Sequence, residues 1–150
     1  NIVAATPAEI NALLMPSPGA IGETTPNTIR SLNKEILEPA TVTLTALKCS
    51  GTLINNYGQS GDAILTLPTC AAGLSFVAVC GTTAAFYWRF LCPAADADKI
   101  YLNGVAGADD GYVQITSASV GATISFVAFQ SEAANYDWLA TTIAGTWVAG

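Results

Sequence analysis

The sequence predicts a mainly β protein, an antiparallel β-sandwich or jelly-roll-like barrel preceded by a short N-terminal arm that contains helical turns. Three observations support this fold class. From residue 40 onward, apolar and β-branched residues recur with the period of two that is typical of β-strands. Turn segments rich in Gly, Asn and Asp separate these runs at regular intervals. The length of 150 residues is that of one domain with a short appendage.

Residues 1–39 are predicted to form the arm. Thr6, Pro7 and Glu9 are predicted to start a short helix, with Thr6 as its cap. The prolines and glycines of segment 15–22 end this helix, and a second helical stripe runs from residue 26 to residue 37. Neither piece is long enough to be stable alone, so we expect the arm to dock on a partner. The residues expected to dock are Ile10, Leu13, Leu14, Pro16, Pro18, Ile21, Pro26, Ile29, Leu32 and Ile36.

Residues 40–150 are predicted to form the β-sandwich domain. Asn103 and Gly104 suit a two-residue hairpin turn, because both central positions of a type I′ turn need a positive φ. Strand order cannot be read from these patterns. The expected strands cover residues 41–47, 52–55, 63–67, 75–79, 84–91, 99–102, 112–116, 123–130, 136–142 and 146–148.

Alternation within the expected strands predicts which side chains share a face. In segment 84–91, Phe86, Trp88 and Phe90 fall on one face, and Tyr87, Arg89 and Leu91 fall on the other. Because both faces are partly apolar, we expect the opposite sheet to cover one and a partner to cover the other. The three tryptophans, Trp88, Trp138 and Trp147, are interpreted as core or subunit-interface residues.

The composition favours self-association. Hydrophobic residues make up 51% of the chain and charged residues 11%, against about 25% charged in typical domains. A surface with so few charges repels a second copy only weakly, so part of the apolar excess is expected to be buried between copies. The five basic residues are scattered in a chain of net charge -6, which disfavours nucleic-acid binding. No uninterrupted apolar run is long enough for membrane insertion.

Motifs of catalysis and cofactor binding are missing from the sequence. It contains no His, no phosphate-binding loop and no nucleophile elbow, so we predict no enzyme, no cofactor and no metal site. The acidic pairs Asp96/Asp98 and Asp109/Asp110 resemble parts of calcium or glycosidase sites, but we interpret them as solvated turn residues.

The four cysteines allow two interpretations. Disulfides Cys49–Cys70 and Cys80–Cys92 are one alternative, and buried free thiols are the preferred one. Among the aromatic residues, Tyr57 and Tyr112 lie at predicted turns and are the candidates for exposed contacts with a glycan.

Several segments resemble proteins of tailed bacteriophages. Residues 16–26 read PSPGAIGETTP, which resembles the P-x-P-G-x-I-G-x-T-T-P element that links anchor and β-rich distal domain in phage fibres. Segments 54–59, 66–68, 98–104, 136–138 and 145–147 resemble a β domain of phage and prophage virion proteins. After Pro26, however, the chain has a helix-like segment where fibre proteins have a short run of small residues. The sequence is therefore compatible with a tail fibre, a head fibre or a capsid-decorating protein.

The resemblance implies a non-catalytic structural virion protein. It would form a homotrimer, assemble in the bacterial cytoplasm and become extracellular with the particle, while its arm contacts other virion proteins. The alternative is a host-surface glycan-binding module that uses Tyr57 and Tyr112. A polysaccharide depolymerase is disfavoured, because no long β-helical platform and no paired carboxylates in a groove are evident.

Overall fold

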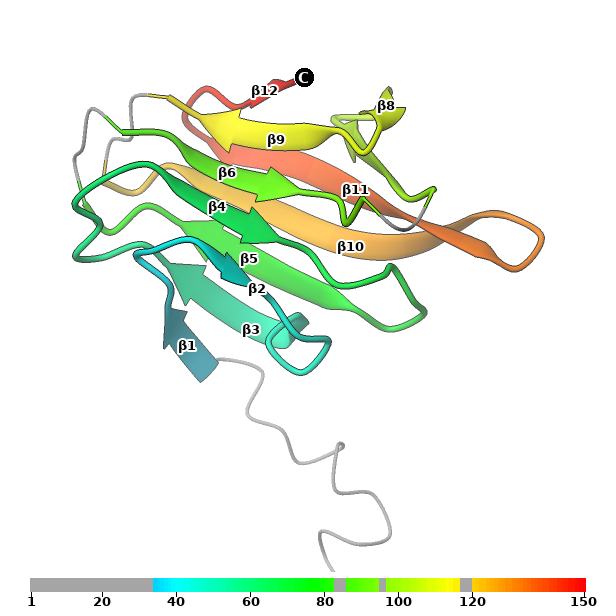
Figure 1. Cartoon of the computed structure of the whole chain (residues 1–150), viewed down its shortest axis with the longest axis horizontal. Coiled ribbons are helices and arrows are strands. Elements are labelled where there is room, and N and C mark those ends of the chain that lie inside the picture. Colours follow the sequence, from blue (N-terminus) through cyan, green and yellow to red (C-terminus); the bar gives the residue numbers. More distant parts are fainter. Residues whose placement is uncertain (1–33, 83–85, 95–96, 117–119) are drawn as a thin grey trace, which may run out of the picture. The chain divides into compact units, whose positions relative to one another are not determined.

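A computed structural model describes residues 34–82, 86–94, 97–116 and 120–150. These residues form two β-sheets that pack face to face (Figure 1). No helix occurs within these ranges, and hence none that could cross a membrane. The prediction of a mainly β, sandwich-like domain is confirmed.

The two sheets differ in size. The larger sheet has seven strands in the order β1 (Lys34–Leu37), β3 (Ser50–Asn55), β5 (Ser75–Val79), β10 (Thr123–Glu132), β11 (Asn135–Ala144), β7 (Lys99–Leu102) and β8 (Val105–Asp109). The smaller sheet has five strands in the order β12 (Val148–Ala149), β9 (Tyr112–Ile115), β6 (Trp88–Leu91), β4 (Ala63–Thr66) and β2 (Val42–Thr43).

Both sheets are mixed, which corrects the expectation of antiparallel sheets. Strands β3, β4, β5 and β6 alternate between the two sheets and reverse direction at each step (Figure 1). As a result β3 and β5 are parallel neighbours in one sheet, and β4 and β6 are parallel neighbours in the other. A strand of the opposite sheet thus serves as the crossover that a parallel pair requires. The pairs β1–β3, β7–β11 and β2–β4 are also parallel.

The core lies between the sheets and is rich in aromatic side chains. Trp88 and Trp138 are fully buried and Trp147 is 6% exposed, so the interpretation of the tryptophans as interior residues is confirmed. In β6, Trp88 and Phe90 face the core, while Arg89 and Leu91 are half-buried on the other face. Phe86 precedes β6 and is exposed, so it does not continue the inward row as predicted.

The N-terminal region departs from the sequence-based expectation where it is described. Residues 34–37, predicted to end a helix, form β1, and Ile36 pairs with Ile54 of β3. Ile36 is half-buried within this sheet, and the strand precedes the expected domain start at residue 40. The other expected docking residues, from Ile10 to Leu32, lie outside the described residues.

One turn and one strand lie at the other edge of the large sheet. Asn103 and Gly104 have φ values of 51° and 85° and join Leu102 to Val105, which confirms the predicted hairpin turn. The following strand β8 was not predicted from the sequence, because its residues VAGAD are poor strand formers.

Candidate functional site

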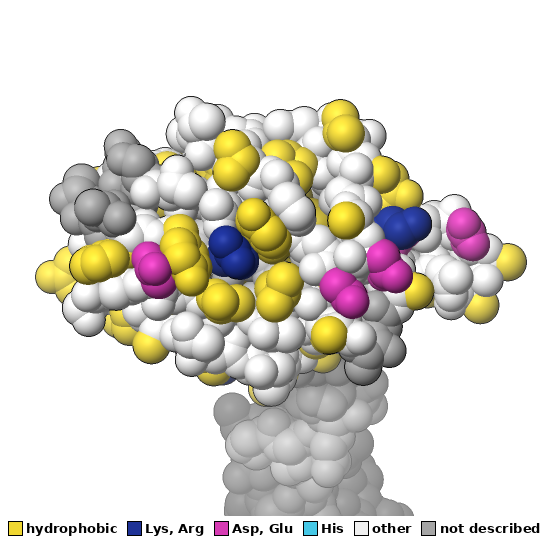
Figure 2. Space-filling view, turned by 45° about the horizontal axis from the view of Figure 1, so that its top comes forward, with side chains coloured by type: hydrophobic (Ala, Val, Ile, Leu, Met, Phe, Trp, Pro, Cys, Tyr) yellow, Lys and Arg dark blue, Asp and Glu magenta, His cyan; other side chains and the backbone are white. Residues whose placement is uncertain are grey.

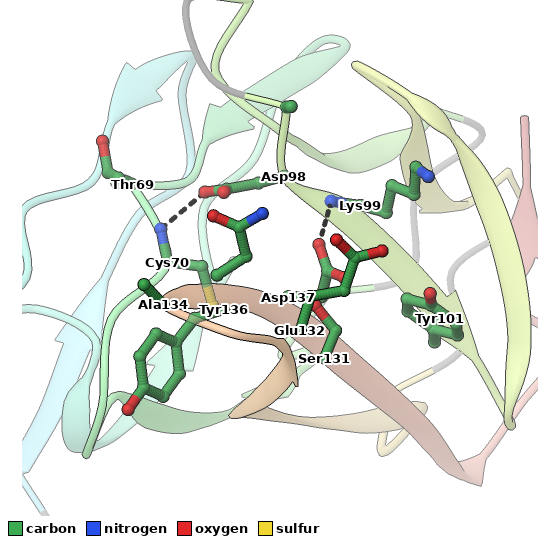
Figure 3. Close-up of a pocket in the computed structure, with 12 residues that line it drawn as sticks. Thr69, Cys70, Asp98, Lys99, Tyr101, Ser131, Glu132, Ala134, Tyr136 and Asp137 are labelled. Carbon is green, nitrogen blue, oxygen red and sulfur yellow. Dashed lines mark hydrogen bonds between the residues drawn. The ribbon is translucent and has the colours of Figure 1, made fainter.

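A pocket of about 460 Å³ opens among the described residues. Segments 69–70, 97–101 and 131–137 line it, so it lies where the start of β7 meets the long β10–β11 hairpin (Figures 1 and 3). In Figure 1 this hairpin extends beyond the other strands. The lining therefore combines three segments that are far apart in the sequence.

Two aspartates tie these segments together. Asp98 Oδ2 accepts a hydrogen bond from the backbone N–H of Cys70, with an N···O distance of 2.6 Å (Figure 3). Asp137 Oδ1 accepts one from the backbone N–H of Lys99, with an N···O distance of 2.8 Å. The β7–β11 ladder begins at Trp138 and Ile100, one residue after Asp137 and Lys99. The Asp137 carboxylate therefore adds a side-chain hydrogen bond at the end of that ladder.

The hairpin turn brings a third carboxylate to the pocket. Glu132 ends β10 and pairs with Asn135 of β11, and Ala134 between them adopts a φ of 67°. The side chain of Lys99, the basic residue of the lining, extends away from Asp98 and Asp137 in Figure 3.

Two buried thiols, Cys70 in the pocket lining and Cys92, respond to the charges of Asp98 and Asp137. Burial raises the pKa of the Cys70 thiol far above its ordinary value, and the charges of Asp98 and Asp137 raise it further. Burial, followed by the same two carboxylates, raises the pKa of Cys92 to about 12. Both aspartates thus lie near both thiols, and the local potential is negative. Such thiols stay protonated at neutral pH and are poor nucleophiles.

All four cysteines are free and buried, as the preferred interpretation predicted, so the disulfides Cys49–Cys70 and Cys80–Cys92 are not formed. In the described part of the chain, no group of three or more His, Cys, Asp or Glu side chains is placed to hold a metal ion.

The two predicted glycan-contact residues do not lie in this pocket. Tyr57 is 65% exposed in the turn that follows β3. Tyr112 is the first residue of β9 and is half-buried, which corrects its interpretation as an exposed turn residue. The turn after β3 and the start of β9 lie at opposite ends of the sandwich (Figure 1), so the two tyrosines do not form one platform.

Arg89 covers Tyr112. The guanidinium carbon lies 3.9 Å from the centroid of the Tyr112 ring and 4.7 Å from that of Tyr87. Arg89 Nε and Nη2 both donate to Gln114 Oε1, at 2.8 and 2.7 Å. On the face drawn in Figure 2, Lys and Arg side chains stand apart from one another, bordered by apolar or acidic side chains, and form no basic patch.

Five apolar side chains lie on the outer face of the seven-stranded sheet. Ile54, Phe76, Phe126, Trp138 and Ile100 point into the core, so the alternate residues of their strands point outward. We call the outward set the outer apolar face. It consists of Leu53, Val77, Val127, Leu139 and Tyr101, one residue from each of five adjacent strands.

Strand register places the members of the outer apolar face in two groups, because across β5 and β10 Val77 pairs with Ser125 and Val127 pairs with Ser75. Leu53 pairs with Val77, Val127 with Leu139, and Leu139 with Tyr101. Val127 is 45% exposed, and the other members are half-buried. Strands β3 and β5 contain no charged residue, whereas the charged residues of β7, β10 and β11 line the pocket.

Two segments of the sequence that supply the pocket lining stand out in the sequence itself. The segments 98–104 and 136–138, singled out only for their resemblance to phage proteins, supply Asp98, Lys99, Tyr101, Tyr136 and Asp137 to its lining. A scan against protein-family models finds no match to the chain, and a search of curated proteins finds none either.

Proposed function

We propose that this chain is a non-catalytic structural component of a bacteriophage virion, a fibre or capsid-decorating protein that assembles as a homotrimer. The outer apolar face is the observation that carries the proposal. Strands β3 and β5 carry no charged residue, so a second copy can cover this part of the face without burying an unpaired charge. The virion assignment is supported further by the resemblance of segment 16–26 to phage fibre linkers.

Association through this face has a simple energetic basis. Removing apolar surface from water contributes about 25 cal/mol for each Å². Because the outer face carries few charges, little of this gain is offset by desolvation of ions. The overall net charge of -6 on 150 residues adds only modest repulsion between copies.

Substitution within the face tests the assembly. Val127→Lys places an ammonium group at the centre of the outer apolar face and should shift the protein from trimer to monomer. Val120→Lys is the matched control, because Val120 is 66% exposed in the turn before β10 and outside that face. Sedimentation velocity over a concentration series measures the result. A monomeric wild-type protein, or equal dissociation of both variants, would reject assembly through this face.

Localisation tests the virion assignment separately. Antibodies against the β domain should label intact phage particles in electron micrographs, at the tail, at the head fibres or over the capsid. Purified particles that lack the chain would reject the assignment even if the isolated protein is trimeric.

Host-surface recognition is the second candidate function. The pocket on the protruding β10–β11 hairpin and the exposed ring of Tyr57 favour it. Binding to a glycan array that persists in Tyr57→Ala and Tyr112→Ala would remove these two residues from the recognition site.

A further inference from the structure

The strands of the smaller sheet carry a single charged residue, Arg89. Arg89 lies in β6, the central strand of this sheet. Its neighbours Trp88 and Phe90 are fully buried in the core, so the Arg89 side chain extends from the outer face of the sheet. Ile64 of β4 and Gln114 of β9 are its register partners there. A cation therefore stands among strands that bear no other charge, in a chain of net charge -6.

Arg89 forms no ion pair with any of the described residues. A guanidinium has five N–H donors, and Nε and Nη2 each give one to Gln114 Oε1. The other N–H groups meet no acceptor in the described part of the chain. Asp62, in the turn before β4, accepts instead from the backbone N–H of Tyr87, at an N···O distance of 3.0 Å. One edge of the guanidinium is therefore available to a carboxylate, in the bidentate geometry that arginine favours.

Two tyrosine rings hold this guanidinium in place. Its carbon lies 3.9 Å from the ring centroid of Tyr112 and 4.7 Å from that of Tyr87. All three residues are half-buried, so the rings restrict the Arg89 side chain and exclude part of the water around it. A donor that is ordered before binding loses less entropy on binding, and partial exclusion of water strengthens its attraction to an anion. The proposed assembly leaves this site uncovered, because the outer apolar face belongs to the other sheet.

We propose that the outer face of the smaller sheet binds, at Arg89, the carboxylate of an acidic sugar such as a hexuronate. The carboxylate accepts hydrogen bonds from the free edge of the guanidinium. The half-buried side chains of Ile64, Tyr87 and Leu91 provide apolar surface for the C–H groups of the sugar ring. This inference rests on the recognition candidate, which it deepens, and is independent of trimer assembly.

Charge decides which ligands are accepted. A neutral sugar can accept hydrogen bonds from Arg89 through its hydroxyl groups but gains no Coulomb attraction from them. A cationic sugar should be repelled by the guanidinium. Sugars of the same ring size should therefore bind in the order glucuronate, then glucose, then glucosamine. Acetate has the carboxylate without the ring and should bind more weakly than glucuronate.

Titration of the full chain with these four ligands at low salt, followed by two-dimensional NMR, tests this order. Glucuronate should shift the Nε–H signal of Arg89 and the amide signals of β6 and β9, with a Kd on the order of 10 mM. Glucose should bind about tenfold more weakly, and glucosamine should not bind. Salt should weaken the binding of glucuronate by screening.

Equal affinities for glucuronate and glucose, or no shifts with glucuronate at a concentration on the order of 100 mM, would overturn the proposal. Acetate that binds as tightly as glucuronate would overturn the assignment of a sugar. Binding of the chain to neutral glycans alone on an array would keep host-surface recognition but reject this site, so the two failures can be told apart.

Two variants locate the site. Arg89→Gln removes the charge and should abolish the binding of glucuronate. Arg89→Lys keeps the charge but loses the planar fork, so it should bind glucuronate about tenfold more weakly than the wild type. Lys34→Gln is the matched control, because it also removes one positive charge and Lys34 is exposed in β1 of the other sheet. The control should bind as the wild type does. Equal weakening in Lys34→Gln would show that net charge, and not Arg89, attracts the ligand, and full binding by Arg89→Gln would exclude the site.

Discussion

Phe76 of β5 and Phe126 of β10 stack with ring centroids 4.6 Å apart and an interplanar angle of 9°. The two residues are register partners in the antiparallel β5–β10 pair, so strand register sets their contact. Phe90 of the smaller sheet meets them at 5.7 and 4.9 Å, and Trp138 presents an edge to Phe76 at 5.8 Å. The two sheets are therefore joined through a single aromatic cluster.

Phe126→Ala should lower the free energy of unfolding by about 3–5 kcal/mol, because it leaves a cavity bordered by three aromatic rings. Phe126→Leu should cost clearly less, since it fills most of that space. Urea unfolding followed by tryptophan fluorescence measures both variants. Ser125→Ala, at the neighbouring outward position, is the control and should stay within about 0.5 kcal/mol of the wild type. A similar loss in the alanine and leucine variants would contradict a cavity as the cause.

Arg89 and Tyr112 should be energetically coupled through the cation–π contact at 3.9 Å. A double-mutant cycle with Arg89→Ala and Tyr112→Leu should give a coupling energy of about 0.5–1 kcal/mol, because the site is half-exposed. Tyr112→Phe retains the ring and should retain most of the coupling. Coupling that disappears in Tyr112→Phe would instead point to the hydroxyl group.

Alkaline pH should destabilise the fold through its buried thiols. Burial raises the pKa of Cys80 from 9.0 to about 11, so the folded state holds this proton after the unfolded state has lost it. The protonated thiol therefore contributes fully to the free energy of unfolding below about pH 9. This contribution, on the order of 2 kcal/mol, is lost as the pH rises from about 9 to about 11.

Cys80→Ala isolates this thiol from the other groups that titrate in the same range. Its free energy of unfolding, measured by urea at several pH values, should fall less steeply above pH 9 than that of the wild type. Parallel curves for the two proteins would contradict a buried, protonated Cys80.

The sequence predicts those strands that are marked by an alternation of apolar and polar residues within the strand itself. The bounds of β5 and β7 match the predicted ranges, and the inward positions of Trp88 and Phe90 in β6 follow from period-two alternation. Strand β1 could not be predicted, because Ile36 and Leu37 continue a helical stripe and only pairing with β3 makes them extended. Tertiary pairing there overrides local preference.

The pocket could not be predicted from any one segment. Cys70, Asp98 and Asp137 are separated by at least 28 residues and meet only because β7 is inserted beside β11. The parallel order of β3 and β5 was likewise hidden, since it depends on how the chain alternates between sheets. Neither relationship leaves a periodic pattern in the sequence.

Asn56 offers a test of the buried polar contacts that hold the turn after β3. Its side chain is fully buried, its Nδ2 donates to Gln59 Oε1 at 2.7 Å, and its Oδ1 accepts from Gly81 N–H at 2.8 Å. Asn56→Asp keeps the shape but replaces the donor with a carboxylate oxygen facing Gln59 Oε1. At neutral pH the free energy of unfolding of the variant should be about 3–5 kcal/mol lower than that of the wild type, because a buried charge is left uncompensated.

The same variant should recover at low pH, and this dependence separates charge from shape. Burial raises the pKa of the new carboxyl above its unfolded value of about 3.9, so the folded state binds the proton more tightly. The stability of the variant relative to the wild type should therefore be greatest below about pH 4 and decline as pH rises. Asn56→Ala, which removes both contacts without adding a charge, should show a deficit that does not change with pH. If the aspartate variant is equally unstable at every pH, repulsion at this buried site is not what destabilises it, and the Asn56–Gln59 hydrogen bond is not oriented as described.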